Sequence, residues 1–224
     1  MGGMKAQQED LVRPLSQWLE IKQVERIKKA LERNGFETLF VPDAKSALKA
    51  ILDMIPDDAR VGVGGSVTLN QIGFFKAVKE KGVNLINPFA RGISLEDRDK
   101  LRREIFSCDY FVCSTNAITE QGQLYNVDAA GNRVAAMFFG PKKVIVVCGI
   151  NKIVKDMDAA RNRLWNLAAP INAKRLARKT PCTETGVCSD CSSPERICNI
   201  SVEILKRPTG SDILVLLVGE PLGL

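Results

Sequence analysis

The stretch Val61-Gly-Val-Gly-Gly-Ser-Val-Thr68 decides the fold of this chain. Its first residues are apolar and β-branched, which predicts a buried strand. Two consecutive glycines, Gly64 and Gly65, predict a turn directly after the strand, and Thr68 is suited to cap a helix that ends at Gly82. The stretch therefore runs from a buried strand through a glycine turn into a helix, which is typical of an α/β protein.

The alternation of strands and helices extends in both directions. Buried strands are predicted at residues 38–41, 83–87, 110–114, 144–148 and 213–218, and helices at residues 17–34, 44–55, 94–106 and 155–169. One face of the first of these helices carries Trp18, Ile21, Val24, Ile27 and Leu31. Pro170 is expected to end the last helix. Because the strands are apolar throughout, we expect a mainly parallel sheet with helices on both faces, a three-layer α/β sandwich.

A single domain is expected to span residues 1–224. Residues 1–56 form its N-terminal helical part, and residues 181–199 form a cysteine-rich loop. Between Gly122 and Ala136, the turn residues of Ala129-Ala-Gly-Asn132 predict a β-hairpin.

The composition narrows the range of functions. Of 224 residues, 45% are hydrophobic, yet no apolar run reaches the roughly 20 residues that span a bilayer, and the first residues lack the apolar segment expected of a secretory signal. We therefore expect a cytoplasmic protein without a membrane segment. The net charge of +6 comes from scattered basic residues with few aromatics, which argues against nucleic-acid binding. Histidine is absent, so any chemistry must use carboxylates, lysine, serine, cysteine or backbone groups.

Polar motifs follow three of the predicted strands, at the edge where parallel sheets bind ligands. These motifs are Gly64–Thr68, Asn116–Glu120 and Asn151–Lys152. Each alone has an ordinary explanation, as a turn or a solvated lysine, but together they favour a small anion such as a carboxylate, a phosphate or a CoA ester. The expected ligand-binding residues are Gly64, Gly65, Ser66, Thr68, Asn116, Gly122, Asn126, Gly131, Asn132 and Asn151. The candidates for acid, base or nucleophile are Glu120, Asp128 and Lys152.

Four cysteines, Cys182, Cys188, Cys191 and Cys198, are concentrated in a polar loop. Four thiolates can bind Zn²⁺ or a [4Fe–4S] cluster. Disulfides are disfavoured because nothing indicates an oxidising compartment. We therefore predict a metal site, and we favour iron–sulfur slightly over zinc. The other three cysteines, Cys108, Cys113 and Cys148, lie on or beside predicted core strands and are interpreted as small hydrophobic residues.

With these motifs in place, the chain resembles the lactate-utilization (LUD) domain family, in particular LutC-like proteins and their short single-domain members. The resemblance lies in VGVGGSVTLNQIG (61–73), STNAITEQGQLYNVDAAGNRVAAMFFGPKKVIVV (114–147), GINKIVKDMDAARNR (149–163), AAPINAKRL (168–176) and PCTETGVCSDCSSPERICN (181–199). It implies a fold similar to ribose-5-phosphate isomerase and the CoA transferases. On that fold Gly64–Thr68 looks like a phosphate loop, and Glu120 is expected to face Ser66. Asn116 stands where the sugar-phosphate isomerases carry Asp, and an amide cannot act as a general base.

Three functions follow from these observations. The first is a protein of lactate or 2-hydroxy-acid utilization that acts with iron–sulfur oxidoreductase subunits and binds a small anion at the strand ends. The second is a stand-alone isomerase or CoA-transferase-like enzyme. The third is a regulatory ligand-binding module with a structural zinc. Whether the chain is catalytic, and whether it forms a homo-oligomer, stays open at the level of sequence.

Overall fold

Six parallel strands form the central sheet of the computed structural model, which describes residues 2–224. Their order across the sheet is β1-β10-β7-β4-β2-β3. The bounds are β1 Glu37–Val41, β2 Arg60–Val63, β3 Asn84–Ile86, β4 Tyr110–Ser114, β7 Lys143–Gly149 and β10 Asp212–Val218. Every strand predicted from the apolar runs is present, and the prediction of a mainly parallel sheet is confirmed.

The apolar strands are explained by burial on both faces of this sheet. In β7, Val144 and Val146 pack into one hydrophobic cluster, and Ile145 and Val147 pack into the other. Because successive side chains of a strand point to opposite faces, a strand with two covered faces needs an apolar residue at every position.

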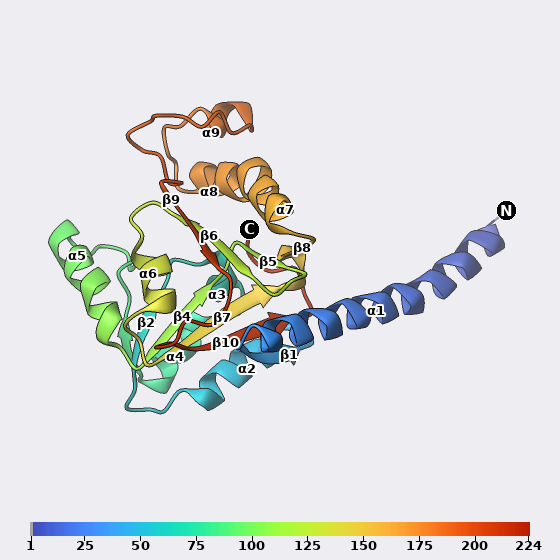
Figure 1. The fold of residues 1–224 in the computed structure, drawn as a ribbon, viewed down its shortest axis with the longest axis horizontal. Helices are drawn as coiled ribbons and strands as arrows, with labels where there is room; N and C mark the ends of the chain where they lie inside the picture. Colours follow the sequence, from blue (N-terminus) through green and yellow to red (C-terminus); the bar gives the residue numbers. More distant parts are fainter. Residues whose placement is uncertain (1) are drawn as a thin grey trace.

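Helices cover both faces, which gives the three-layer sandwich (Figure 1). The helices α2 (Ala44–Met54), α3 (Val67–Gln71) and α4 (Phe74–Lys81) pack on one face. On the other face lie the C-terminal part of α1 (Gly2–Arg33) and α6 (Asn132–Phe138). The remaining α-helices are α5 (Leu95–Glu104), α7 (Met157–Arg163), α8 (Ala169–Arg175) and α9 (Cys182–Thr185).

A second sheet, which the sequence did not predict, packs on the α1 and α6 side of the central sheet. Its order is β8-β5-β6-β9, with β8 Ile153–Val154, β5 Ala117–Thr119, β6 Leu124–Asp128 and β9 Ile200–Ile204. Its outer face is covered by α7 and α8. The predicted hairpin exists as the antiparallel pair β5–β6, but its turn contains Gly122 (φ 76°). The stretch Ala129–Asn132 leads into α6 instead, so its assignment as the hairpin turn was wrong.

Two helix boundaries also differ from the sequence prediction. Ser66, not Thr68, caps α3, because its hydroxyl accepts the N–H of Leu69. A single helix to Gly82 was also wrong, since Gly73 adopts φ 77° and separates α3 from α4. Pro170 does not end the helix that begins at Met157. A π-helical turn at Leu164–Ala168 joins α7 to α8, and Pro170 lies in the first turn of α8, where no N–H is needed.

Helix α1 extends beyond the sheet at its N-terminal end, as Figure 1 shows. Val24, Ile27 and Leu31 are buried against the sheet. Trp18 and Ile21, expected on the same buried face, are 58% and 54% exposed, because this part of the helix lies past the sheet edge. Within residues 2–224, none of the helices combines the length and the apolar character that crossing a membrane requires.

Candidate functional site

Four neighbouring strands, β10, β7, β4 and β2, end at the same edge of the central sheet. The segments that leave them begin at Gly219, Ile150, Thr115 and Gly64. Because the strands are parallel and adjacent, these four segments meet, although they are far apart in the sequence. This edge is where sequence motifs predicted a ligand site.

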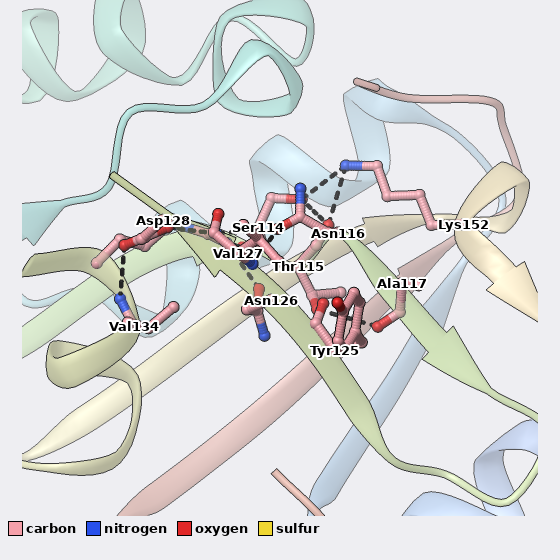
Figure 2. A network of polar contacts seen from close by, with 11 residues as sticks. Ser114, Thr115, Asn116, Ala117, Tyr125, Asn126, Val127, Asp128, Val134 and Lys152 are labelled. Atoms are coloured by element: carbon pink, nitrogen blue, oxygen red, sulfur yellow. Dashed lines mark hydrogen bonds and ion pairs between the residues drawn. The ribbon is translucent and has the colours of Figure 1, made fainter. Parts of the chain in front are cut away.

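Lys152 lies at the centre of this edge and is 3% exposed. Its ammonium donates to Ser114 Oγ (2.9 Å), to Thr68 Oγ1 (3.0 Å) and to the Thr115 carbonyl (3.3 Å). Figure 2 shows the Lys152 side chain reaching toward the end of β4. We call Thr68, Ser114, Thr115 and Lys152 the lysine cluster. A lysine has three N–H donors, and all three are used here.

No carboxylate among the described residues lies close enough to Lys152 to form an ion pair. The pKa of this lysine is lowered from 10.5 to about 8, mainly by burial and in part by repulsion from the guanidinium groups of Arg163 and Arg133. Near neutral pH the lysine is therefore mostly charged, in a buried place where hydroxyls and a carbonyl stand in for a counter-ion.

Arg133, in the first turn of α6, connects the other polar residues of this edge. It bonds the Asp128 carboxylate through Nε (2.9 Å) and Nη2 (2.6 Å), and it donates to the amide oxygens of Asn126 (2.7 Å) and Asn116 (3.0 Å). Its Nη1 also donates to the carbonyl of Ser114 in the lysine cluster (2.8 Å). The arginine thus joins the end of β4 to the last three residues of β6, as a support for the lysine cluster.

This network decides what Asp128, Asn126 and Asn116 can do. The second carboxylate oxygen of Asp128 accepts the N–H of Val134 (3.0 Å), so both oxygens are engaged (Figure 2). Asn126 is fully buried, and its amide nitrogen has no partner among the described residues. The sequence predicted a catalytic role for Asp128 and ligand binding for the two asparagines. In the structure, the bonds of these three residues orient the strand end.

Arg163, at the end of α7, is a second cation at the same edge. Its guanidinium donates to the carbonyls of Asn116 (3.0 Å) and Asn151 (3.3 Å), and burial lowers its pKa. It joins no carboxylate among the ion pairs of the described residues. Asp128 offsets one of the three cations, so the edge keeps an excess of positive charge.

The glycine turn packs closely against this network. A Cβ at Gly64 would lie 3.0 Å from the Arg133 side chain, and one at Gly65 would lie 3.1 Å from the ring of Phe89. Glycine is therefore needed here for close approach. The turn carries Ser66 to its capping position and Thr68 into the lysine cluster.

Other residues predicted for the site lie elsewhere. Glu120 is exposed in the β5–β6 turn, where its N–H donates to Val154, and no contact joins it to Ser66 among the described residues. Gly122 of the same turn packs against the backbone of α1 at Ala30.

Three further residues predicted to bind a ligand, Gly131, Asn132 and Asn151, are instead surrounded by other parts of the chain. Gly131 (φ 82°) precedes α6 and faces Ile200, and the amide nitrogen of Asn132 is buried without a partner among the described residues. Asn151 accepts the N–H of Leu222 (2.9 Å). Asn151 is thus near the lysine cluster but turned toward the chain that follows β10.

The cysteine-rich loop lies apart from this edge, beyond α8 (Figure 1). Cys182, Cys188, Cys191 and Cys198 all border one small recess, whose floor is formed by Ala169 and other residues of α8. All four are partly buried free thiols. No three Cys, Asp or Glu side chains within residues 2–224 converge into a ready-made metal site. The fold brings the thiols to one recess, and the predicted metal site stays a prediction.

One cation accompanies these thiols. Arg196 donates to the carbonyls of Cys191 (2.7 Å) and Cys198 (3.1 Å). Burial raises the pKa of Cys198. Arg196 also pairs with the Asp190 carboxylate (2.7 Å), so its charge is already shared with an acid. Four thiols that border one recess are a donor set that fits a thiolate-bound metal or cluster.

Sequence reasoning missed four residues of the strand-end site: Ser114, Thr115, Arg133 and Arg163. Ser114 ended a predicted strand, Arg133 lay in the predicted hairpin at residues 122–136 and Arg163 in the predicted helix at residues 155–169, and none of them was assigned a ligand-binding or catalytic role. The available signal was their position, because Ser114 ends a predicted strand and Arg133 follows Asp128 by five residues.

Fold and site together define an α/β protein with a buried cationic site at the carboxyl edge of a parallel sheet and a separate cysteine-rich loop. The family model described as the LUD domain matches residues 24–218, so the chain belongs to the LUD domain family.

Two solved structures resemble this fold to different degrees. A DUF162 family protein from Deinococcus radiodurans superposes with a TM-score of 0.52 at 11% identity, covering 89% of this chain and 98% of that chain. Ribose 5 phosphate isomerase A from Neisseria gonorrhoeae gives a TM-score of 0.34 at 13% identity, over 51% of this chain and 54% of that chain. None of the curated proteins matches this sequence.

Proposed function

We propose that this chain is a LUD protein of lactate or other 2-hydroxy-acid utilization that binds a small anionic metabolite at the lysine cluster. The cysteine-rich loop binds a [4Fe–4S] cluster or Zn²⁺, with iron–sulfur favoured. Iron–sulfur oxidoreductase subunits are the partners that this function requires.

The buried charge of Lys152 is the observation that carries the proposal. Burying an ammonium ion without a counter-ion is costly, and proteins normally pair such a charge. Here Arg163 and Arg133 add positive charge to the same edge. A bound carboxylate or phosphate would supply the missing negative charge, and this explains why the fold keeps a lysine at position 152.

The positions of the carboxylates speak against an isomerase of the sugar-phosphate type. Asn116 cannot act as a base, Asp128 is held by Arg133 and Val134, and Glu120 is exposed in the distant turn. Lys152 is left as the group that can hold or release a proton at this edge. Its pKa of about 8 suits both an anion contact and proton transfer.

The cysteine-rich loop would hold its metal through Cys182, Cys188, Cys191 and Cys198, which border one recess. A bound [4Fe–4S] cluster would supply one-electron transfer, whereas Zn²⁺ would fix the shape of the loop. Anaerobic purification separates the two. A brown protein with iron and sulfide supports the iron–sulfur version, and a colourless protein with one zinc per chain contradicts it and supports a structural zinc.

The anion site is tested by calorimetric titration of the full chain with L-lactate, pyruvate and inorganic phosphate. We expect Lys152→Met to lose binding of whichever anion the wild type binds. Lys155→Met, which changes an exposed lysine three residues away, should bind as the wild type does. Equal binding by wild type and Lys152→Met would remove the lysine cluster from the proposal.

A further inference from the structure

The chain that follows β10, residues 219–224, crosses the strand ends directly over the lysine cluster. We call these residues the strap. The Gly219 N–H donates to Val41 O (2.9 Å), and the Glu220 carboxylate accepts the N–H of Ala44 (3.0 Å). Further along the strap, the N–H groups of Leu222 and Gly223 donate to the side-chain oxygens of Asn151 (2.9 Å) and Gln71 (2.6 Å).

Gly223 is the point where the strap meets the lysine cluster. A Cβ at this position would lie 2.3 Å from Thr68 Oγ1 and 2.7 Å from Lys152 Nζ. Its φ of 71° also favours glycine. A backbone without a side chain therefore lies against the ammonium group, and this cover helps to leave Lys152 only 3% exposed.

The strap is held by the four hydrogen bonds given above and by Leu222 and Leu224, which pack against two hydrophobic clusters. The strap contains no helix or strand, and its most buried side chain is Leu222, at 5% exposure. The lysine cluster, by contrast, is built on β4 and on the segments that leave β2 and β7. Segments with few buried contacts open locally at much lower cost than the sheet that carries them.

We propose that the strap is a gate: closed, it covers the lysine cluster, and its residues Leu222 and Gly223 swing away from Asn151 and Gln71 to let a small anion reach Lys152. The gate rests on the anion site proposed above, since a site under a closed strap needs an opening. The closed strap keeps water away from Lys152, and this accounts for a charged lysine that stays dry between binding events.

Chemical labelling of Lys152 tests the gate without any ligand. Reductive methylation of the full chain with formaldehyde and cyanoborohydride at pH 8 is followed by peptide mass spectrometry. The wild type should label slowly at Lys152. The methyl group of Gly223→Ala collides with the cluster and therefore favours the open state. Because only the open state reacts, Lys152 of this variant should label at least about tenfold faster.

Gly82→Ala is the matched control. Gly82 has φ 78°, close to that of Gly223, but a Cβ there meets nothing within 4 Å. It therefore introduces the same backbone strain without touching the strap, and its Lys152 labelling should match that of the wild type. Equal labelling in Gly223→Ala and Gly82→Ala would overturn the gate.

Gln71→Ala is the second variant, used if Gly223→Ala fails to fold by circular dichroism. It removes one hydrogen bond to the strap from an exposed side chain, and faster labelling at Lys152 is again expected. Unchanged labelling in Gln71→Ala would contradict the gate. If labelling accelerates but none of L-lactate, pyruvate and inorganic phosphate binds, the gate stands as a motion and the anion site fails, so the two proposals fail separately.

Discussion

The lysine cluster and the cysteine-rich loop are the two chemically distinctive regions of the molecule, and they are built in opposite ways. The lysine cluster is buried and its three N–H groups are fully bonded. The four cysteines are partly buried, and they border a recess without forming a ligand set. The fold orients every group of the lysine cluster, whereas it only gathers the four thiols around one recess.

The difference follows from where each region sits. The lysine cluster is carried by β4 and by the segments that leave β2 and β7, so its geometry is determined by the core of the protein. The cysteine-rich loop is attached through α8 and β9, and short hydrogen bonds such as that from Arg196 to Cys191 hold it locally. A site on strands is positioned without a ligand, whereas a loop site gains its shape from metal binding.

Changing one cysteine should have the largest effect. Cys191→Ser removes one of four thiolates, and we expect metal content to fall from about one metal or cluster per chain to near zero, since such sites need the full donor set. Cys148→Ala, in a core strand, is the control and should keep its metal. Elemental analysis after anaerobic purification is the measurement. Full metal content in Cys191→Ser would break the comparison, because the loop would then not be a metal site.

Removal of the Arg133 side chain tests how rigidly the strand-end site is held. Arg133→Ala leaves Asp128 buried without its partner, so we expect the free energy of unfolding to fall by about 3–5 kcal/mol. Arg161→Ala is the matched control, because Arg161 pairs with Asp158 and Glu203 on the surface and should cost about 1 kcal/mol or less. Urea denaturation measures both. Similar costs for the two variants would show that the network at β6 adds little rigidity.

The pH dependence of stability tests the buried charge. The pKa of Lys152 is about 8 in the folded protein and 10.5 for an ordinary lysine, so between these values the unfolded chain binds more protons. The free energy of unfolding therefore rises with pH in this window, by about 1.4 kcal/mol per pH unit and on the order of 3 kcal/mol in all. Below pH 8 the cost of the buried charge is fully present.

Two variants separate this contribution from the other groups that titrate in alkali. Lys152→Met should lack the rise between pH 8 and 10.5, whereas Lys155→Met should keep it, since Lys155 is exposed. The measurement is urea denaturation at several pH values. Identical pH profiles for the two variants would mean that Lys152 is not a buried charge.

The sequence predicted the central sheet well because its strands are apolar at every position. It missed the second sheet for the opposite reason: β8 has two residues and β5 has three, too few to show any alternation. The two strands pair with each other although they are distant in the sequence. Pro170 was misread because proline is tolerated in a first helical turn, and the π-helical turn before it cannot be recognised from residue types.

The site was predicted in part for similar reasons. Strand ends led to Lys152, Thr68 and the glycine turn, because their position follows from the order of strands and helices. Arg133 and Arg163 reach the site through long side chains whose direction the sequence does not reveal. Glu120 was expected at the site from a resemblance between folds, and the turn that carries it packs against α1 instead.

The smallest expected effect concerns the turn that leads from α8 into the cysteine-rich loop. Ala177 has φ 51°, a left-handed conformation that costs an L-residue roughly 1–2 kcal/mol. The N–H groups of Ala177 and Arg178 donate to the carbonyls of Lys174 and Ala173, a helix end at which glycine is the usual residue. Ala177→Gly should therefore raise the free energy of unfolding by about 0.5–1 kcal/mol, after the added entropy of the unfolded chain is subtracted.

Gly82→Ala provides the reverse change, because Gly82 caps α4 at φ 78° in open space. The free energy of unfolding of this variant should fall by a similar amount. Urea denaturation of both variants measures the pair. If Ala177→Gly gains stability and also loses metal, the strained turn positions the cysteine-rich loop, and this region is preorganised after all. If stability rises and the metal content is unchanged, the metal shapes the loop, and the contrast with the lysine cluster holds.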